Sequence, residues 1–175
     1  MYKTIAIAFI CIISSNAHSI TSSSEPAPLK AVKFVDIQRY LGKWYQVATI
    51  PQGFQAGCKN STATYNKLEK AKISVTNVCY ISGKNYTVNG TARVVDSVAN
   101  SKLKVKLISP DEGDYWIIEL DEFYQYAVIA TPNRKNLWIL TRTSVISESL
   151  YQNLIKIIVK KHHFNPLLIK RTEHS

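Results

Sequence analysis

From Val32 onward, the chain is a succession of short segments in which apolar and polar residues alternate, with turn-forming residues between them. Residues 102–107 alternate strictly, so a strand there places three lysines on one face and three aliphatic side chains on the other. We interpret the lysine face as a solvated outer surface, with a polyanion-binding stripe as the alternative. Short strands at regular spacing are typical of an all-β sandwich or barrel. Eight are predicted, at residues 43–50, 60–66, 72–81, 86–96, 102–109, 115–121, 124–131 and 137–142.

One helix is predicted after the last of these strands. Ser147 suits the N-cap, and Lys160 and Lys161 suit the final turn, where positive charge is favourable. Apolar residues recur at helical spacing, namely Leu150, Leu154, Ile157 and Ile158. We expect this stripe to dock on the sheet rather than on a membrane or a partner. Pro166 then ends the helical pattern, and residues 167–169 are predicted to return as a last short strand.

Composition is consistent with one globular domain. Of the 175 residues, 46% are hydrophobic, and no stretch approaches the eighteen apolar residues that a membrane-spanning helix needs. A multi-pass membrane protein is therefore excluded. The formal net charge of +10 favours anionic partners such as lipid head groups or polyanions, and leaves association with a membrane surface open. We expect no nucleic-acid partner, and these patterns leave the oligomeric state undetermined.

The first seventeen residues have the features of a secretory signal. Lys3 precedes an apolar run at residues 5–13, and the small residues Ser15 and Ala17 suit cleavage after Ala17. Cleavage after Ser19 and a buried N-terminal helix are the alternatives.

On this interpretation, residues 18–31 are a polar spacer and residues 32–175 are the domain, so the mature protein is secreted or periplasmic and soluble. Anchoring to an outer membrane would need an acylated cysteine preceded by a small residue. Cys11 follows Ile10 and lies within the apolar run, which makes it a poor lipid-attachment motif.

Two cysteines remain once the signal is removed, and in an exported protein the default is a disulfide between them. A hairpin with a loop at residues 67–70 pairs Asn66 with Ala71, and this register places Cys58 opposite Cys79. The apolar alternation of the two strands misses this register by one residue, so we also expect a bulge. Two free thiols are the alternative.

A search for catalytic or metal-binding motifs finds little, and we predict no enzyme, no cofactor and no metal site. The chain has no glycine-rich phosphate loop and no His-Glu-x-x-His or Cys-x-x-Cys pattern. An acidic cluster around Gly113 fits a hairpin turn better than a calcium loop. None of the four histidines, His18, His162, His163 and His174, lies in a predicted strand. We interpret His162 and His163 as solvated residues at a helix end rather than as metal ligands.

Three separated motifs resemble those of the lipocalins. Gly42-Lys43-Trp44 matches the first signature of this family, residues 120–127 resemble the second, and Arg142 ahead of the helix matches the third. Within the family the chain is most similar to the bacterial lipocalin and apolipoprotein D branch, over roughly residues 34–169. The resemblance implies an eight-stranded antiparallel up-and-down barrel with one C-terminal helix packed on its outside, closed at one end and open at the other.

The same resemblance implies roles for individual residues. Gly42, Trp44 and Arg142 are implied to be structural, with Trp44 closing one end and Arg142 stacked on its indole. Alternation then predicts an apolar, ligand-binding inner wall, in which Tyr115 supplies a polar contact for a carboxylate or hydroxyl. The predicted lining is Ala63, Ile73, Val75, Leu103, Val105, Leu107, Tyr115, Ile117, Ala127, Ile129, Trp138 and Leu140. Residues 51–57, with Phe54 at their middle, resemble the family's lid over the open end.

Our first functional hypothesis is therefore a non-enzymatic, extracytoplasmic carrier or store for a small hydrophobic ligand, such as a fatty acid or lysophospholipid. A second is an enzyme on the same barrel, which would need Cys58 or Cys79 as a free thiol. A third is a basic protein that binds anionic membranes or polyanions on its outer surface.

Overall fold

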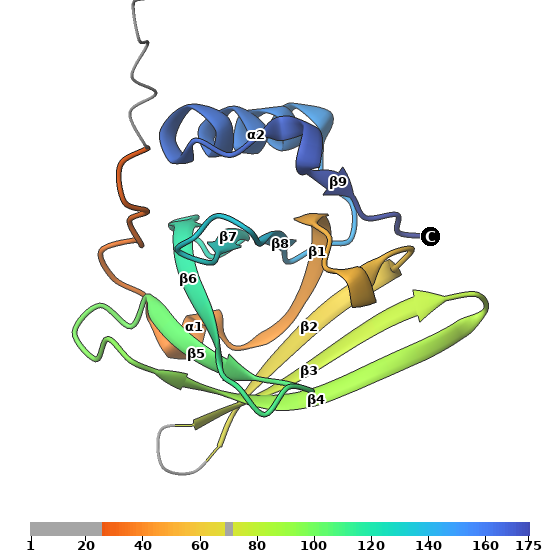
Figure 1. The fold of residues 1–175 in the computed structure, drawn as a ribbon, viewed down its shortest axis with the longest axis horizontal. Helices are drawn as coiled ribbons and strands as arrows, with labels where there is room; N and C mark the ends of the chain where they lie inside the picture. Colours follow the sequence, from red (N-terminus) through yellow and green to blue (C-terminus); the bar gives the residue numbers. More distant parts are fainter. Residues whose placement is uncertain (1–25, 69–71) are drawn as a thin grey trace, which may run out of the picture.

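The predicted strands are present, with ends that differ by a few residues from the sequence-based bounds. The computed structural model describes residues 26–68 and 72–175, so the predicted signal at 1–17 lies outside the described residues. The strands are β1 (Gly42–Ile50), β2 (Lys59–Lys67), β3 (Lys72–Ile81), β4 (Lys84–Val94), β5 (Lys102–Lys106), β6 (Gly113–Leu120), β7 (Tyr126–Ala130) and β8 (Leu137–Thr141). Each pairs antiparallel with the next (Figure 1).

The first strand closes the barrel because it pairs on both of its edges. Tyr45 to Ile50 pair with β8, and Gly42 to Tyr45 pair with β2. The eight-stranded antiparallel barrel predicted above is thereby confirmed. The chain enters at one end through α1 (Ile37–Tyr40), a short helix that the sequence analysis did not predict. Its cause is local, because the Asp36 side chain accepts hydrogen bonds from two backbone N–H groups of its first turn.

The predicted last strand at residues 167–169 is wrong. Leu167 and Leu168 belong to a 3-10 turn, η2 (Pro166–Leu168), and Ile169 caps its end. The turn forms because Asn165 caps the Leu167 N–H and proline favours the first turn of a helix. The strand comes next, as β9 (Lys170–Arg171), which pairs with β1 beyond the point where β2 leaves it. The backbone N–H of Asn60 in β2 also donates to the Glu173 carbonyl, so the C-terminal segment bridges β1 and β2.

The β2–β3 hairpin confirms the disulfide and the bulge but corrects the register. Asn66 pairs with Ser74 rather than with Ala71, and the bulge lies between Lys59 and Thr62. This pairing removes the mismatch of one residue in the apolar alternation. The bulge restores the approach of the two cysteines, and Cys58 and Cys79 form a disulfide with their Cα atoms 5.4 Å apart.

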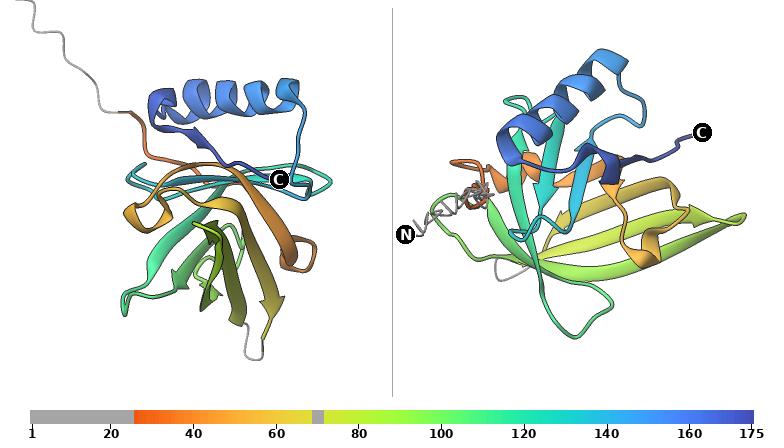
Figure 2. Two further views of the ribbon diagram at one scale, coloured as in Figure 1. Left: turned by 90° about the vertical axis from the view of Figure 1, so that its right-hand side faces the viewer. Right: turned by 45° about the horizontal axis from the view of Figure 1, so that its top comes forward.

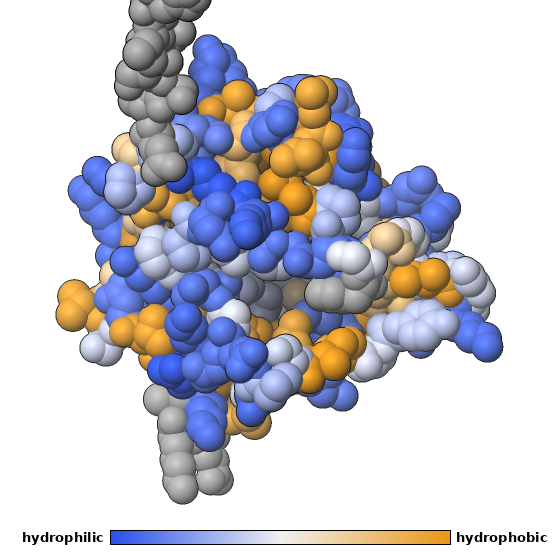
Figure 3. All heavy atoms as spheres, in the orientation of Figure 1, coloured by the Kyte–Doolittle hydropathy of each residue, from blue (hydrophilic) through white to orange (hydrophobic). Residues whose placement is uncertain are grey.

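The long helix α2 (Glu148–His162) packs on the outside of the barrel, as predicted, with Ser147 as its N-cap (Figure 2). Leu154 and Ile158 are completely buried against the outer faces of β1, β6, β7 and β8, whereas Ile157 is only half-buried. Each fully buried side chain of this size contributes roughly 1.5–3 kcal/mol. Figure 3 shows hydrophobic side chains gathered over α2 and the strands beneath it. The outer barrel wall is therefore apolar on the side where the apolar face of α2 packs against it.

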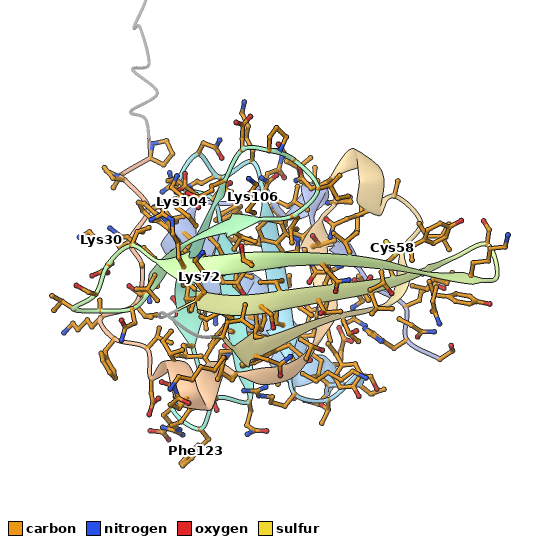
Figure 4. The ribbon with its side chains drawn as sticks, turned by 90° about the horizontal axis from the view of Figure 1, so that it is seen from below. Lys30, Cys58, Lys72, Lys104, Lys106 and Phe123 are labelled. Atoms are coloured by element: carbon orange, nitrogen blue, oxygen red, sulfur yellow. A yellow bond between two sulfur atoms is a disulfide. The ribbon has the colours of Figure 1, made fainter. Side chains whose placement is uncertain are left out.

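The opposite wall is exposed and basic, and Figure 4 views it with Lys72, Lys104 and Lys106 labelled. Lys104 forms an ion pair with Asp114 at 2.9 Å, and Lys102 stacks on Trp116. This arrangement agrees with the interpretation of a solvated outer face.

Gly90 in β4 provides a test of the barrel wall. A Cβ atom there would lie 2.1 Å from the Lys106 carbonyl oxygen, so Gly90→Ala must push β4 and β5 apart. We expect the free energy of unfolding to fall by about 2 kcal/mol in urea denaturation. Gly53→Ala is the control, because no atom lies within 4 Å of its added Cβ. Equal stability of the two variants would contradict the close approach.

Candidate functional site in the barrel interior

The inner wall of the barrel is a single apolar cluster. All twelve residues of the predicted lining belong to it. Eight of them are buried, whereas Val105, Leu107, Tyr115 and Trp138 keep part of their surface accessible. These four belong to the inner cluster of the barrel rather than to the outer one that packs under α2. The placement of the twelve agrees with the prediction, and their contact with a ligand stays a prediction.

The barrel is closed at the end where α1 lies. There Trp44 is completely buried, and its indole N–H donates to the Tyr40 carbonyl at 2.8 Å. The Arg142 guanidinium lies 3.7 Å from the centre of the indole ring, which is the predicted cation–π contact. Arg142 also donates to the carbonyls of Arg39 and Lys43, and therefore ties α1 and β1 to the end of β8.

Replacing this arginine tests the closed end. In Arg142→Lys the ammonium keeps the charge but loses the planar stack and the fork of hydrogen bonds. We expect the free energy of unfolding to fall by about 2 kcal/mol in urea denaturation. Arg171→Lys is the matched control, because Arg171 also lies 3.7 Å from an aromatic ring, that of Tyr151, but is half exposed. There we expect about 0.5 kcal/mol or less, and equal losses would contradict a special role for Arg142.

Three tyrosines meet inside the barrel next to Trp44. The hydroxyl of Tyr115 lies 2.7 Å from that of Tyr40 and 2.9 Å from that of Tyr65. Two hydrogen bonds use two of the three phenol protons, so one donor of this tyrosine cluster remains for another group. Tyr115 therefore does face inward, as predicted, but acts together with two residues that the sequence analysis missed. Tyr65 could have been predicted as a lining residue from the sequence, because it shares its face of β2 with Ala63.

Burial raises the pKa of all three tyrosines, that of Tyr65 to about 12. Tyr65 thus stays protonated in the folded state at pH values where an unfolded tyrosine, with a pKa near 10, has ionised. Its contribution to stability is complete below about pH 10 and is lost as the pH rises to about 12. The loss amounts to about 1.4 kcal/mol per pH unit. We expect Tyr65→Phe to flatten the fall of unfolding free energy over this range in urea titrations, and an unchanged slope would contradict the shift.

Two further polar side chains lie on the inner wall and were also missed. Ser61 shares its face of β2 with Ala63, and Asn77 on β3 is the direct cross-strand partner of Ala63. Within the described part of the chain, neither the Ser61 Oγ nor the Asn77 Oδ1 has a hydrogen-bond partner, and both atoms are buried. The parity that predicted Ile73 and Val75 also places Asn77 inward.

The loops at the open end are linked across it. The segment at residues 51–57 contains a 3-10 turn, η1 (Gly53–Gln55), and the Gln52 side chain donates to Asn136 between β7 and β8. This contact is consistent with the predicted lid, whereas the side chain of Phe54 lies outside the described part of the structure.

Two grooves on the surface are alternative binding sites. A groove of about 340 Å³ lies between residues 51–59 and the C-terminal segment, and one of about 550 Å³ lies between residues 27–33 and the end of α2. In the larger groove Arg134 is occupied, because it donates to the carbonyls of Ala27 and His162. We take the barrel interior as the candidate site because all eight barrel strands contribute to its apolar wall.

His162 is a correction to the sequence analysis, which interpreted it as solvated. It is only 4% exposed, and its ring nitrogen lies 2.6 Å from the Glu119 carboxylate. Burial raises the pKa of Glu119, but hydrogen bonds from His162 and Lys161 outweigh this effect and leave it below its ordinary value. His162 thus fastens α2 to β6. Across residues 26–68 and 72–175, no group of three or more potential ligands is placed to hold a metal ion.

Comparison with known proteins agrees with this geometry. A family model described as a lipocalin-like domain matches residues 35–173. The chain is 41% identical over 133 residues to the putative lipocalin R877 of Acanthamoeba polyphaga mimivirus, covering 71% of this chain and 76% of that protein. It is 33% identical over 150 residues to the outer membrane lipoprotein Blc of Citrobacter freundii, covering 83% and 85%. Insecticyanin of the tobacco hornworm Manduca sexta, a solved structure, aligns with a TM-score of 0.68 and 18% identity, over 84% of this chain and 85% of that one.

The chain therefore belongs to the lipocalin family, and the resemblance identified from its three motifs is confirmed. Lipocalins bind small hydrophobic ligands.

Proposed function

We propose that this protein binds a fatty acid or a lysophospholipid in its barrel, as a carrier or store rather than as an enzyme. The observation that carries the proposal is the inner wall, which is apolar, closed beside Trp44, and partly accessible at Val105, Leu107 and Trp138. An apolar barrel interior of this kind suits one hydrocarbon chain.

Burial of the chain provides the driving force. At about 0.8 kcal/mol for each buried methylene, a long acyl chain gains roughly 10 kcal/mol before the cost of ordering it. This gain is enough for micromolar to submicromolar affinity without any charged contact. The enzymatic alternative would need a free thiol as its catalytic group, and Cys58 and Cys79 are instead joined in a disulfide.

An extracytoplasmic location is part of the proposal. It is supported by the disulfide, since such bonds persist in oxidising compartments, and by the likeness to a relative named as an outer membrane lipoprotein. None of the helices in the described ranges is long and apolar enough to span a membrane. A basic outer surface is consistent with contact between the protein and an anionic membrane.

The direct test is native mass spectrometry of the mature protein purified from its own host, followed by organic extraction and lipid identification. We expect one fatty acid or lysophospholipid per chain. An empty barrel that also fails to bind any added lipid, measured by tryptophan fluorescence, would overturn the proposal.

Filling the cavity distinguishes the interior from the surface. Val105→Trp places a large side chain where Val105 is still accessible, so we expect lipid affinity to fall at least tenfold in fluorescence titrations. Lys106→Trp, on the outer face of the same strand, is the control and should leave affinity unchanged. If the control loses affinity and the interior variant does not, and binding falls steeply with salt, then the ligand binds outside.

A further inference from the structure

The inner wall carries two polar atoms that the folded chain leaves unpaired. Ser61 is 6% exposed, and its hydroxyl lacks a hydrogen-bond partner among the described residues, as does the buried Oδ1 of Asn77. Both are on the inner faces of adjacent strands, with Asn77 opposite Ala63 and Ser61 two residues from Ala63. They are therefore diagonal neighbours across the β2–β3 pair, within reach of one small group between them.

An unpaired buried polar atom costs stability, because it has lost its hydrogen bonds to water without replacement. Apolar side chains at both positions would give a more stable empty barrel, as they do at Ile73 and Val75 on the same face. The pair is thus a feature that a ligand could complete, since native proteins pair most buried polar groups.

The chemistry of the two atoms restricts that ligand. The Asn77 carbonyl oxygen can only accept a hydrogen bond, whereas the Ser61 hydroxyl can also donate one. A ligand hydroxyl satisfies both, because it donates to Asn77 and accepts from Ser61. An ether, an ester carbonyl or a carboxylate offers no proton to Asn77. The neighbours of this pair on the same strand faces, Ala63, Tyr65 and Val75, are uncharged. An ionised group held here would therefore receive no counter-charge from them.

Position along the barrel restricts the ligand further. Cys79, on the same face of β3 two residues after Asn77, forms the disulfide that lies toward the open end, whereas Tyr65 and Trp44 lie toward the closed end. A hydroxyl held at Ser61 and Asn77 therefore lies between a chain that extends inward and a head group that stays outside.

We propose that Ser61 and Asn77 form a hydroxyl-recognition site, which selects amphiphiles that carry a free hydroxyl between acyl chain and head group. The inference rests on the proposed function and deepens it, because it favours lysophospholipids or monoacylglycerols over fatty acids, whose only polar group is a carboxylate.

The test compares two ligands that differ only in whether the glycerol 2-oxygen carries a proton or a methyl group. One is 1-palmitoyl-lysophosphatidylcholine, and the other is its 2-O-methyl ether, with the same chain and charge. We expect the wild-type protein to bind the free alcohol about tenfold more tightly in calorimetric titrations. In Asn77→Leu and in Ser61→Ala this preference should shrink to less than threefold, while the acyl chain is still bound.

The matched controls carry the same changes on outer faces. Asn89→Leu lies on the outer face of β4, and Ser74→Ala lies on the outer face of β3. Both should keep the tenfold preference. Stability of the ligand-free protein provides a second measurement, because removal of an unpaired buried group should raise Tm by a few degrees in the two inner variants.

Each outcome is decisive for one of the two proposals. Equal binding of the two lipids by the wild-type protein would overturn the hydroxyl site and leave the proposed function standing. Unchanged preference in the inner variants, or a lower Tm in both of them, would also overturn the site. If neither lipid binds and no fatty acid binds, the proposed function itself fails.

Discussion

The stacking of Arg142 on Trp44 is the interaction on which the inside of this barrel depends. One guanidinium covers the indole and holds the backbone of α1 and of the first residues of β1 through three carbonyl groups. Because α1 is held there, Tyr40 is buried and reaches Tyr115. The closed end therefore does more than close the barrel, since it also positions the tyrosine cluster.

The inner wall combines two opposing requirements. Its apolar residues stabilise the fold and suit a hydrocarbon chain, whereas the Ser61 hydroxyl and the Asn77 Oδ1, which have no hydrogen-bond partner among the described residues, cost stability. A barrel built for stability alone would be filled by apolar side chains. Under the proposed function, the polar groups on β2 and β3 are the part of the wall where ligand binding rather than packing explains the residue type.

The alternation of inward and outward side chains predicted the barrel interior well, because successive residues of each strand point to opposite faces except at the bulges. It placed Val105 inward and Lys104 outward correctly, and helical spacing likewise placed Leu154 against the sheet. The prediction failed where a strand register or a turn depends on individual contacts that do not repeat along the sequence. The register of Asn66 depends on the bulge near Lys59, and the turn at Pro166 depends on a side-chain cap.

The polar residues of the site were missed for a different reason. Asn77 faces inward but is polar, so a search for apolar lining residues does not select it. Its position in the alternation of β3, two residues after Val75, nevertheless predicts that it faces inward. The burial of His162 depends on Glu119 from a distant strand, and no local pattern indicates such a contact. Tyr40 lies in a helix of one turn, where no alternation applies.

Closure of the barrel between β1 and β8 also constrains the order of folding. Tyr45 can pair with Thr141 only after nearly the whole domain has been synthesised, and pairings between residues so far apart in sequence make folding slow. Until then β1 lacks one neighbour, and the apolar outer faces of β6 and β7 lack α2. A chain with this topology therefore cannot close its barrel until residues as far as Thr141 have been synthesised, whereas the hairpin that brings Cys58 beside Cys79 is complete much earlier in the chain.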